Sequence, residues 1–183
     1  MSKKIPEHAK KVFSGIIFDA YQREQKLFDG SYTTFEALKR RNGVIIIPIT
    51  STGKIIVIQD EQPNRDLKIT VPTGSVDDNE KEIETADREL LEETGYKAKE
   101  IEFLGKEESI WQKIDFEIHY FLGLNCEKIA QQKLEGGERI KTFKMGLEEF
   151  KEVLENPKFD KYVKNFIEKH NILNKINEII KKN

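Results

Sequence analysis

Three glutamates in one short stretch, Glu89, Glu92 and Glu93, are the residues of this chain best suited to chemistry. An α-helix turns by about 100° per residue, so steps of three and four residues return to the same side and place these carboxylates within an arc of about 100°. Hard divalent cations such as Mg²⁺ bind clustered carboxylate oxygens and share their remaining coordination positions with water and substrate phosphates. The trio therefore predicts a divalent metal site and a phosphate-bearing substrate.

Two nearby residues support this interpretation. Arg88 lies four residues before Glu92, so it can pair with that carboxylate, or with Glu80 near the helix start, and hold the ligands in position. Gly74 stands where a strand turns toward the helix, and it lets the backbone approach a metal or a phosphate without a side chain in the way. Both residues fit a site that gathers charge around the glutamates.

An acidic helix face is usually a solvated surface, and for the three glutamates alone this alternative is as good as a metal site. The spacing of the glutamates relative to the other residues of the segment favours the metal site. Gly74 is followed by Glu80, then by Arg88 with the three glutamates, and then by Gly95-Tyr96. At this chain's own residue frequencies, a chance match to that pattern is on the order of one in a million.

The elements that position this segment follow from hydrophobic periodicity and turn residues. Two continuous apolar runs, 44–49 and 54–58, are typical of central strands buried on both faces. Apolar residues at helical spacing predict a helix over 79–94, capped by Asn79 with Glu82 and ended by Gly95. Further elements are expected as a β-meander over 12–38 with a hairpin at Asp29-Gly30, a strand over 67–71 that Pro72-Thr73-Gly74 stops, strands over 101–104, 114–124 and 139–145, and helices over 147–155 and 159–181.

The 23-residue stretch GSVDDNEKEIETADRELLEETGY, from Gly74 to Tyr96, resembles a complete Nudix box. The resemblance implies an α/β fold: a Nudix-type α/β/α sandwich with a mixed sheet, preceded by an N-terminal antiparallel β-meander. It divides the chain into the meander, 1–40, and the hydrolase domain with C-terminal helices, 41–183. The implied activity is hydrolysis of the pyrophosphate bond of a nucleoside diphosphate linked to another group.

The same resemblance implies roles for the box residues. Mg²⁺ or Mn²⁺ would be bound by Glu89, Glu92 and Glu93, and the Gly74 carbonyl would be an additional ligand. Arg88 and Glu80 would hold the box in shape, and together with Glu93 they would belong to the catalytic group.

A weaker resemblance, to the ADP-ribose pyrophosphatase subfamily, extends over the meander and the segments 34–40 and 59–63. It implies ADP-ribose or a nucleoside diphosphate sugar as the substrate, and a homodimer built through the meander. Glu61 stands where that subfamily usually has arginine, and 108–113 lacks its proline-containing signature. A nucleoside triphosphate or RNA 5′-end pyrophosphohydrolase is therefore the alternative activity. A non-catalytic nucleotide-sensing module is the alternative class, although such a module would be expected to lose box glutamates.

Other candidate residues lie outside the box. In relatives of that subfamily the carboxylate that accepts the proton of the attacking water often lies on a loop ahead of a late strand. The loop 134–140 has this placement and contains two glycines that let it close, so Glu138 is the first candidate for the base and Glu135 the second, against the alternative of a plain surface turn. The candidate substrate contacts are Trp111 and Phe35, which could stack on a base or ribose but could equally pack in the core, and Arg40 and Arg65, which could bind phosphate but could equally be surface residues.

The composition limits the remaining possibilities. The 31 Lys and Arg residues nearly balance the 33 Asp and Glu residues, so the formal net charge of −2 gives no reason to expect a nucleic-acid or anionic-membrane partner. No apolar run approaches the roughly 18 residues that a membrane span needs. The single cysteine, Cys126, cannot form an intrachain disulfide, and a buried structural thiol fits a reducing compartment. We expect a cytoplasmic enzyme with a small nucleotide substrate.

Overall fold

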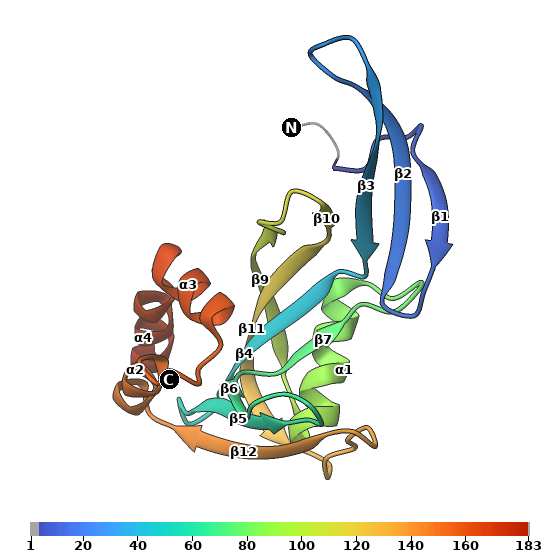
Figure 1. Cartoon of the computed structure of the whole chain (residues 1–183). Coiled ribbons are helices and arrows are strands. Elements are labelled where there is room, and N and C mark those ends of the chain that lie inside the picture. Colours follow the sequence, from blue (N-terminus) through green and yellow to red (C-terminus); the bar gives the residue numbers. More distant parts are fainter. Residues whose placement is uncertain (1–3, 183) are drawn as a thin grey trace.

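Two β-sheets and four helices make up residues 4–182, the part of the chain that the computed structural model describes (Figure 1). The smaller sheet contains the three strands of the predicted meander, β1 (Lys10–Ser14), β2 (Phe18–Lys26) and β3 (Tyr32–Arg40), which run antiparallel in sequence order. The turn between β2 and β3 contains Gly30, whose φ of 87° is a conformation that glycine adopts without strain. The meander and its hairpin are confirmed.

The larger sheet has eight strands in the order β12-β5-β4-β11-β8, with β6 beside β5, β7 beside β4 and β9 beside β11. Its two central pairs differ in direction, since β4 is parallel to β11 and antiparallel to β5, so the sheet is mixed. The strands are β4 (Gly43–Thr50), β5 (Ile55–Glu61), β6 (Lys68–Thr70), β7 (Thr73–Ser75), β8 (Tyr96–Lys97), β9 (Glu100–Glu108), β11 (Glu117–Lys128) and β12 (Arg139–Met145).

Helices cover both faces of the larger sheet. On one face lies α1 (Glu82–Thr94), and on the other lie α2 (Leu147–Leu154), α3 (Lys161–Lys169) and α4 (Ile172–Lys182) (Figure 1). Successive residues of β4 alternate between two cores, because Ile46 packs with Leu90 of α1, whereas Ile45 packs in the cluster that includes α2, α3 and α4. In that second core, Tyr120 and Phe166 stack with their ring centroids 3.6 Å apart. The predicted α/β/α sandwich is confirmed.

Four element predictions differ from the structure. The segment predicted to stop a strand forms β7 instead, because its backbone pairs with β4. Helix α1 begins at Glu82 and not at 79; Asn79 has a φ of 69°, and the carboxylate of Glu84 accepts a hydrogen bond from the Lys81 backbone N–H at 3.0 Å. The helix predicted over 159–181 is two helices, because Asn171, with a φ of 53°, breaks it.

The strand predicted over 114–124 is also divided. Its first two residues form β10 (Ile114–Asp115), which pairs in parallel with β3 and so belongs to the smaller sheet. The rest belongs to β11 in the larger sheet. The chain therefore passes between the two sheets here as well as directly from β3 to β4. The loop that contains Trp111 precedes β10 and so lies at the boundary between the sheets.

Candidate active site

The box strand β7 passes so close to α1 that only glycine fits at its centre without moving a side chain of the helix. A methyl group on Gly74 would overlap the side chain of Glu89. One residue earlier, the backbone N–H of Thr73 donates a hydrogen bond of 3.1 Å to Oε2 of Glu93, whose exposed fraction is only 5%. The strand and the helix therefore hold Glu89 beside Gly74 and Glu93 against the Thr73 backbone.

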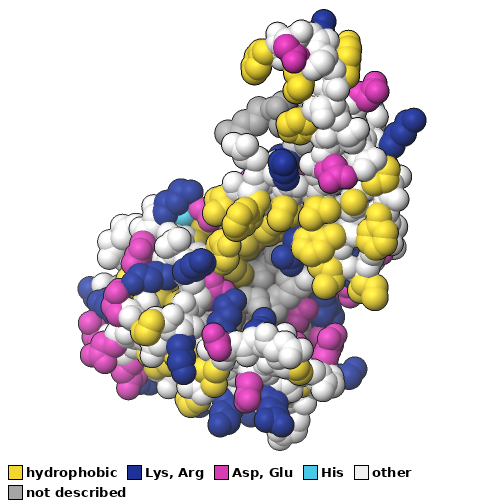
Figure 2. All heavy atoms as spheres, in the orientation of Figure 1, with side chains coloured by type: hydrophobic (Ala, Val, Ile, Leu, Met, Phe, Trp, Pro, Cys, Tyr) yellow, Lys and Arg dark blue, Asp and Glu magenta, His cyan; other side chains and the backbone are white. Residues whose placement is uncertain are grey.

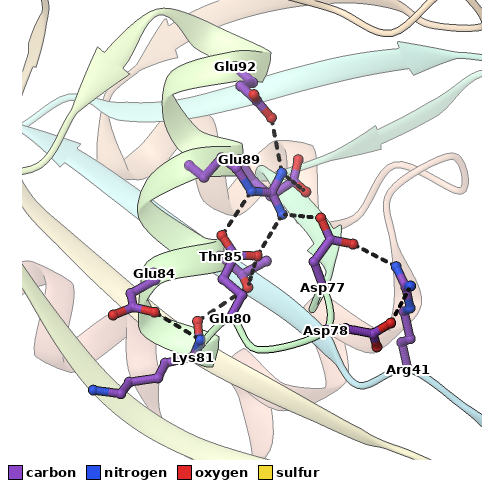
Figure 3. A network of polar contacts seen from close by, with 10 residues as sticks. Arg41, Asp77, Asp78, Glu80, Lys81, Glu84, Thr85, Glu89 and Glu92 are labelled. Carbon is purple, nitrogen blue, oxygen red and sulfur yellow. Dashed lines mark hydrogen bonds and ion pairs between the residues drawn. The ribbon is translucent and has the colours of Figure 1, made fainter.

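Arg88 contacts three glutamates, Glu80, Glu89 and Glu92, which are labelled in the polar network of Figure 3. It donates to both carboxylate oxygens of Glu80, each at 3.0 Å, and through Nη1 to Glu89 at 2.8 Å and Glu92 at 3.0 Å. The hydroxyl of Thr85 donates a further hydrogen bond of 2.7 Å to Glu80. The hydrogen bonds from Arg88 lower the pKa of Glu80 to about 2, and those carboxylates in turn raise the pKa of Arg88 above its usual value.

A second arginine fixes the loop that leads into α1. Arg41, just after β3, binds Asp77 at 2.6 Å and Asp78 at 3.3 Å (Figure 3). The guanidinium of Arg41 therefore forms ion pairs with two carboxylates of the box loop. The box loop is thus attached to the end of the smaller sheet.

Burial changes the charge state of the innermost glutamates. It raises the pKa of Glu89 to about 7, against the opposing effect of Arg88, and the charges of Glu92 and Glu138 contribute in the same direction. Burial and the charge of Glu89 raise the pKa of Glu93 well above its ordinary value, although the Thr73 N–H opposes this. A buried and a partly buried carboxylate that repel each other are a donor set suited to a hard cation, which would stabilise their charged forms.

Within residues 4–182, no three His, Cys, Asp or Glu side chains are already gathered around one point as metal ligands. The reason is that Arg88 draws Glu89 and Glu92 to itself, whereas Glu93 turns to Thr73. All three glutamates nevertheless lie on one helix beside Gly74. A divalent cation fits this set if Glu89 and Glu92 exchange their hydrogen bonds with Arg88 for the ion.

The two candidates for the general base differ in their positions. Glu138 receives a hydrogen bond of 3.2 Å from the Glu135 backbone N–H and a weaker one of 3.4 Å from Gln62. Burial raises its pKa, and its charge contributes to the raised pKa of both Glu89 and Glu93, so it lies within electrostatic range of the box carboxylates. Glu135, in contrast, takes part in this arrangement through its backbone N–H, which donates the hydrogen bond to Glu138.

Three of the four candidate substrate residues line one pocket. Arg40, Arg65 and Trp111 surround a pocket of about 420 Å³ whose lining also includes Thr73 and Gly74. The fourth candidate, Phe35, is not among its lining residues. It lies on β3 in the smaller sheet, with the Arg23 guanidinium 5.5 Å and the Lys113 ammonium 5.7 Å from its ring centroid.

Sequence reasoning missed several residues of this region, namely Asp60, Lys68, Asp160 and Tyr162. Asp60 is only 5% exposed; one of its oxygens pairs with Arg65, and the other, Oδ1, has no hydrogen-bond partner among the described residues. Its charge raises the pKa of Glu93 and of Glu138. An aspartate two residues after the apolar run 54–58, near the end of the buried strand β5, is a signal that could have identified it.

The fold and the site together define a class of protein: α/β/α hydrolases that carry a carboxylate helix beside a glycine-containing strand. Comparison with known proteins agrees. The NUDIX domain family matches residues 39–168, which is most of the chain. The chain therefore belongs to the Nudix family, and it is a pyrophosphohydrolase.

Individual relatives resemble the chain to different extents. An ADP-ribose pyrophosphatase of Bacillus subtilis (strain 168) is 28% identical over 149 residues, which cover 80% of each chain. A methanol dehydrogenase activator of Bacillus methanolicus is 29% identical over 96 residues, so the match spans about half of that protein and 52% of this one. A solved structure described as an ADP compounds hydrolase shares the fold with a TM-score of 0.71 at 20% identity, over 92% of this chain and 95% of the other.

Proposed function

We propose that this protein is a metal-dependent hydrolase of ADP-ribose or a related nucleoside diphosphate sugar. The observation that carries the proposal is a pair of carboxylates, the partly buried Glu89 beside Gly74 and the buried Glu93 bonded to the Thr73 backbone, next to a pocket lined with cationic and aromatic residues. The likeness to the Bacillus subtilis ADP-ribose pyrophosphatase over 80% of each chain supports the substrate. Water would add across the diphosphate, and the products would be a nucleoside monophosphate and a sugar phosphate.

The proposed cofactor is Mg²⁺ or Mn²⁺, held by the side chains of Glu89, Glu92 and Glu93 and by the Gly74 carbonyl. Such an ion neutralises phosphate charge and acidifies water. Before the ion binds, Arg88 holds Glu89 and Glu92 beside each other, and Glu80 in turn fixes Arg88 through two hydrogen bonds of 3.0 Å. The box would thus supply four ligands from one helix and one strand, and water and substrate phosphate would occupy the other positions.

Glu138 is the proposed general base. Its raised pKa suits a group that must accept a proton from water near neutral pH. The Glu135 N–H and Gln62 orient its carboxylate, and Gly136 and Gly137 allow the loop that carries it to approach the substrate. Glu135 is the second candidate, and its own carboxylate would act only if the loop rearranged.

The test is a panel of nucleoside diphosphate sugars, dinucleotides and nucleoside triphosphates assayed with Mg²⁺ and with product identification. We expect Glu93→Gln to lower kcat on the best substrate by roughly 10²–10⁴-fold, the range for a group that acts at the reacting centre. Glu82→Gln, in the first turn of the same helix, is the matched control and should retain activity. Full activity of Glu93→Gln would refute the mechanism.

Product identity separates the alternative activities. A nucleoside triphosphate pyrophosphohydrolase releases inorganic pyrophosphate from its nucleotide, whereas an enzyme acting on a nucleoside diphosphate sugar does not. An RNA 5′-end enzyme would act on 5′-triphosphorylated oligonucleotides. Thermal stabilisation by a panel compound without any turnover would instead favour a nucleotide-sensing module.

We also propose that the smaller sheet, with residues 1–40 as its main part, joins two copies of the chain into a homodimer, and that 41–183 forms the catalytic domain. Every residue of β1 is exposed, and its outer edge has no partner strand among the described residues. Figure 2 shows hydrophobic side chains gathered on the end of this sheet nearest the rest of the molecule. A second copy would cover the apolar side chains there, Val12, Phe13, Ile16 and Ile17.

No helix within residues 4–182 is long and apolar enough to cross a membrane. The proposed location is the cytoplasm, where a single thiol stays reduced. Cys126 is buried, and burial raises the pKa of its thiol to about 12, as expected for a structural cysteine.

A further inference from the structure

The pocket beside Gly74 is lined by both cationic and aromatic side chains. Arg40, Arg65 and Lys68 line it, and of the acidic residues only Asp160 does. The glutamates of α1 are not among its lining residues, so the pocket carries net positive charge next to a strongly acidic site. This arrangement suits a substrate whose phosphates lie between the positively charged pocket and the acidic site on α1.

Two of the cations are held by buried carboxylates. Arg65 pairs with Asp60, and Lys68 pairs with Asp160, whose side chain is only 5% exposed. Asp60 and Lys68 lie opposite each other in the pairing of β5 with β6, so both pairs belong to one small region of the sheet. Because each carboxylate is buried, each cation keeps a fixed position, and less side-chain entropy is lost when an anion binds.

Asp160 also connects this region to the C-terminal helices. It is the N-cap of α3, where its Oδ1 accepts a hydrogen bond of 2.7 Å from the Tyr162 N–H, and its own backbone N–H donates to the Ile69 carbonyl at 2.8 Å. The cap therefore fixes the first turn of α3 against β6. In consequence Tyr162, which is on that first turn, becomes part of the pocket lining.

The aromatic side chains that line the pocket come from distant parts of the chain. Trp111 and Phe116 flank β10, Phe18 begins β2, and Tyr162 belongs to α3. Trp111 and Tyr162 remain 58% and 38% exposed, so their rings are accessible, and the Arg40 guanidinium lies 4.8 Å from the Phe116 ring centroid. A volume of about 420 Å³ is in the range of small-molecule sites.

We propose that Lys68, held by Asp160, and Tyr162 form a subsite for the nucleoside monophosphate half of the substrate, in which Lys68 and Arg65 bind its phosphate and Tyr162 and Trp111 contact its base. A planar base can use the aromatic surfaces, whereas a sugar phosphate cannot stack on two of them. This inference rests on the proposed function for its substrate. It adds that the start of helix α3 completes the substrate site within one copy of the chain.

The first test measures binding of adenosine monophosphate to the whole protein in the presence of EDTA by calorimetry, so it requires no turnover. We expect Lys68→Gln and Tyr162→Ala each to weaken binding by about tenfold. Tyr162→Phe should keep wild-type affinity, because the ring remains. Lys164→Gln, on the same helix but paired with Glu155 outside the pocket, is the matched control and should also bind normally.

The second test compares ribose 5-phosphate in the same titrations, together with KM and kcat on the best panel substrate. The subsite predicts unchanged ribose 5-phosphate binding in Lys68→Gln and Tyr162→Ala, and a KM raised about tenfold with little change in kcat. Unchanged nucleotide affinity in both variants, equal weakening of ribose 5-phosphate, or no nucleotide binding by the wild-type protein would overturn the inference. If the wild-type protein shows no turnover but the variants lose nucleotide binding, the proposed function fails and the subsite stands.

Discussion

At the scale of single residues, the pair formed by Arg88 and Glu80 makes a prediction about pH. The folded state lowers the pKa of Glu80 from an ordinary value of 4.5 to about 2, so the pair stabilises the fold above pH 4.5, and this contribution is lost as the pH falls toward 2. We expect Glu80→Gln to lower the free energy of unfolding by about 1–2 kcal/mol at pH 7. The difference from wild type should shrink between pH 4.5 and 2, measured by urea denaturation.

A double-mutant cycle is the control for this prediction. In an Arg88→Gln background the partner is absent, so adding Glu80→Gln at pH 7 should cost much less than it does in the wild-type protein. Additive losses at pH 7 would show that the two side chains do not stabilise each other.

Residues whose roles depend on local spacing were predictable from the sequence. Glu89, Glu92 and Arg88 lie on one helix, where a fixed turn per residue determines which side chains meet. Lys68 and Asp160 were not predictable in this way, because their pairing depends on how α3 docks against β6, a contact between residues that are 92 positions apart. The charge of Lys68 or of Asp160, taken alone, does not predict that the two residues form an ion pair.

At the scale of elements, the close approach of β7 to α1 predicts the effect of Gly74→Ala. The added methyl group would displace Glu89, a flexible side chain, so we expect a loss of stability of only about 1–3 kcal/mol. Affinity for Mn²⁺ should fall about 10–100-fold, because a metal ligand is moved. Thermal unfolding and Mn²⁺ titration measure the two effects separately.

Gly146→Ala is the matched control, since a methyl group there meets only ordinary contacts, with nearest atoms at 3.5 Å and 3.7 Å, far along the chain from the box. It should leave Mn²⁺ affinity unchanged. Equal Mn²⁺ affinity in Gly74→Ala and wild type would contradict the placement of Glu89 in the metal site.

Strands and helices with strong periodicity were predicted well, and their ends were not. The apolar runs of β4 and β5 are buried on both faces, as such runs predict. β7 was missed because Pro72 and Gly74 suggest a turn, whereas the β4 backbone supplies the hydrogen bonds that make this segment a strand. The break between α3 and α4 was missed because apolar residues continue at helical spacing across Asn171, and a left-handed residue leaves little trace in that pattern.

At the scale of the whole molecule, the exposed apolar end of the smaller sheet predicts self-association. Ile16 and Ile17, in the turn between β1 and β2, are 97% and 64% exposed, a large apolar surface for two adjacent residues. We expect the wild-type protein to have twice the 21.4 kDa mass of one chain in size-exclusion chromatography with light scattering. Replacing both residues with aspartate should produce a folded monomer, because buried like charges would repel across the interface.

The equally accessible Ile129, 60% exposed and just after β11, provides the control, and Ile129→Asp should leave the mass unchanged. Because the pocket with Lys68 and Tyr162 is complete within one chain, the monomeric variant should also keep its affinity for adenosine monophosphate. A wild-type protein that remains at the mass of one chain at about 100 μM would refute the homodimer. A monomer that loses nucleotide binding would instead show that the second copy contributes to the site.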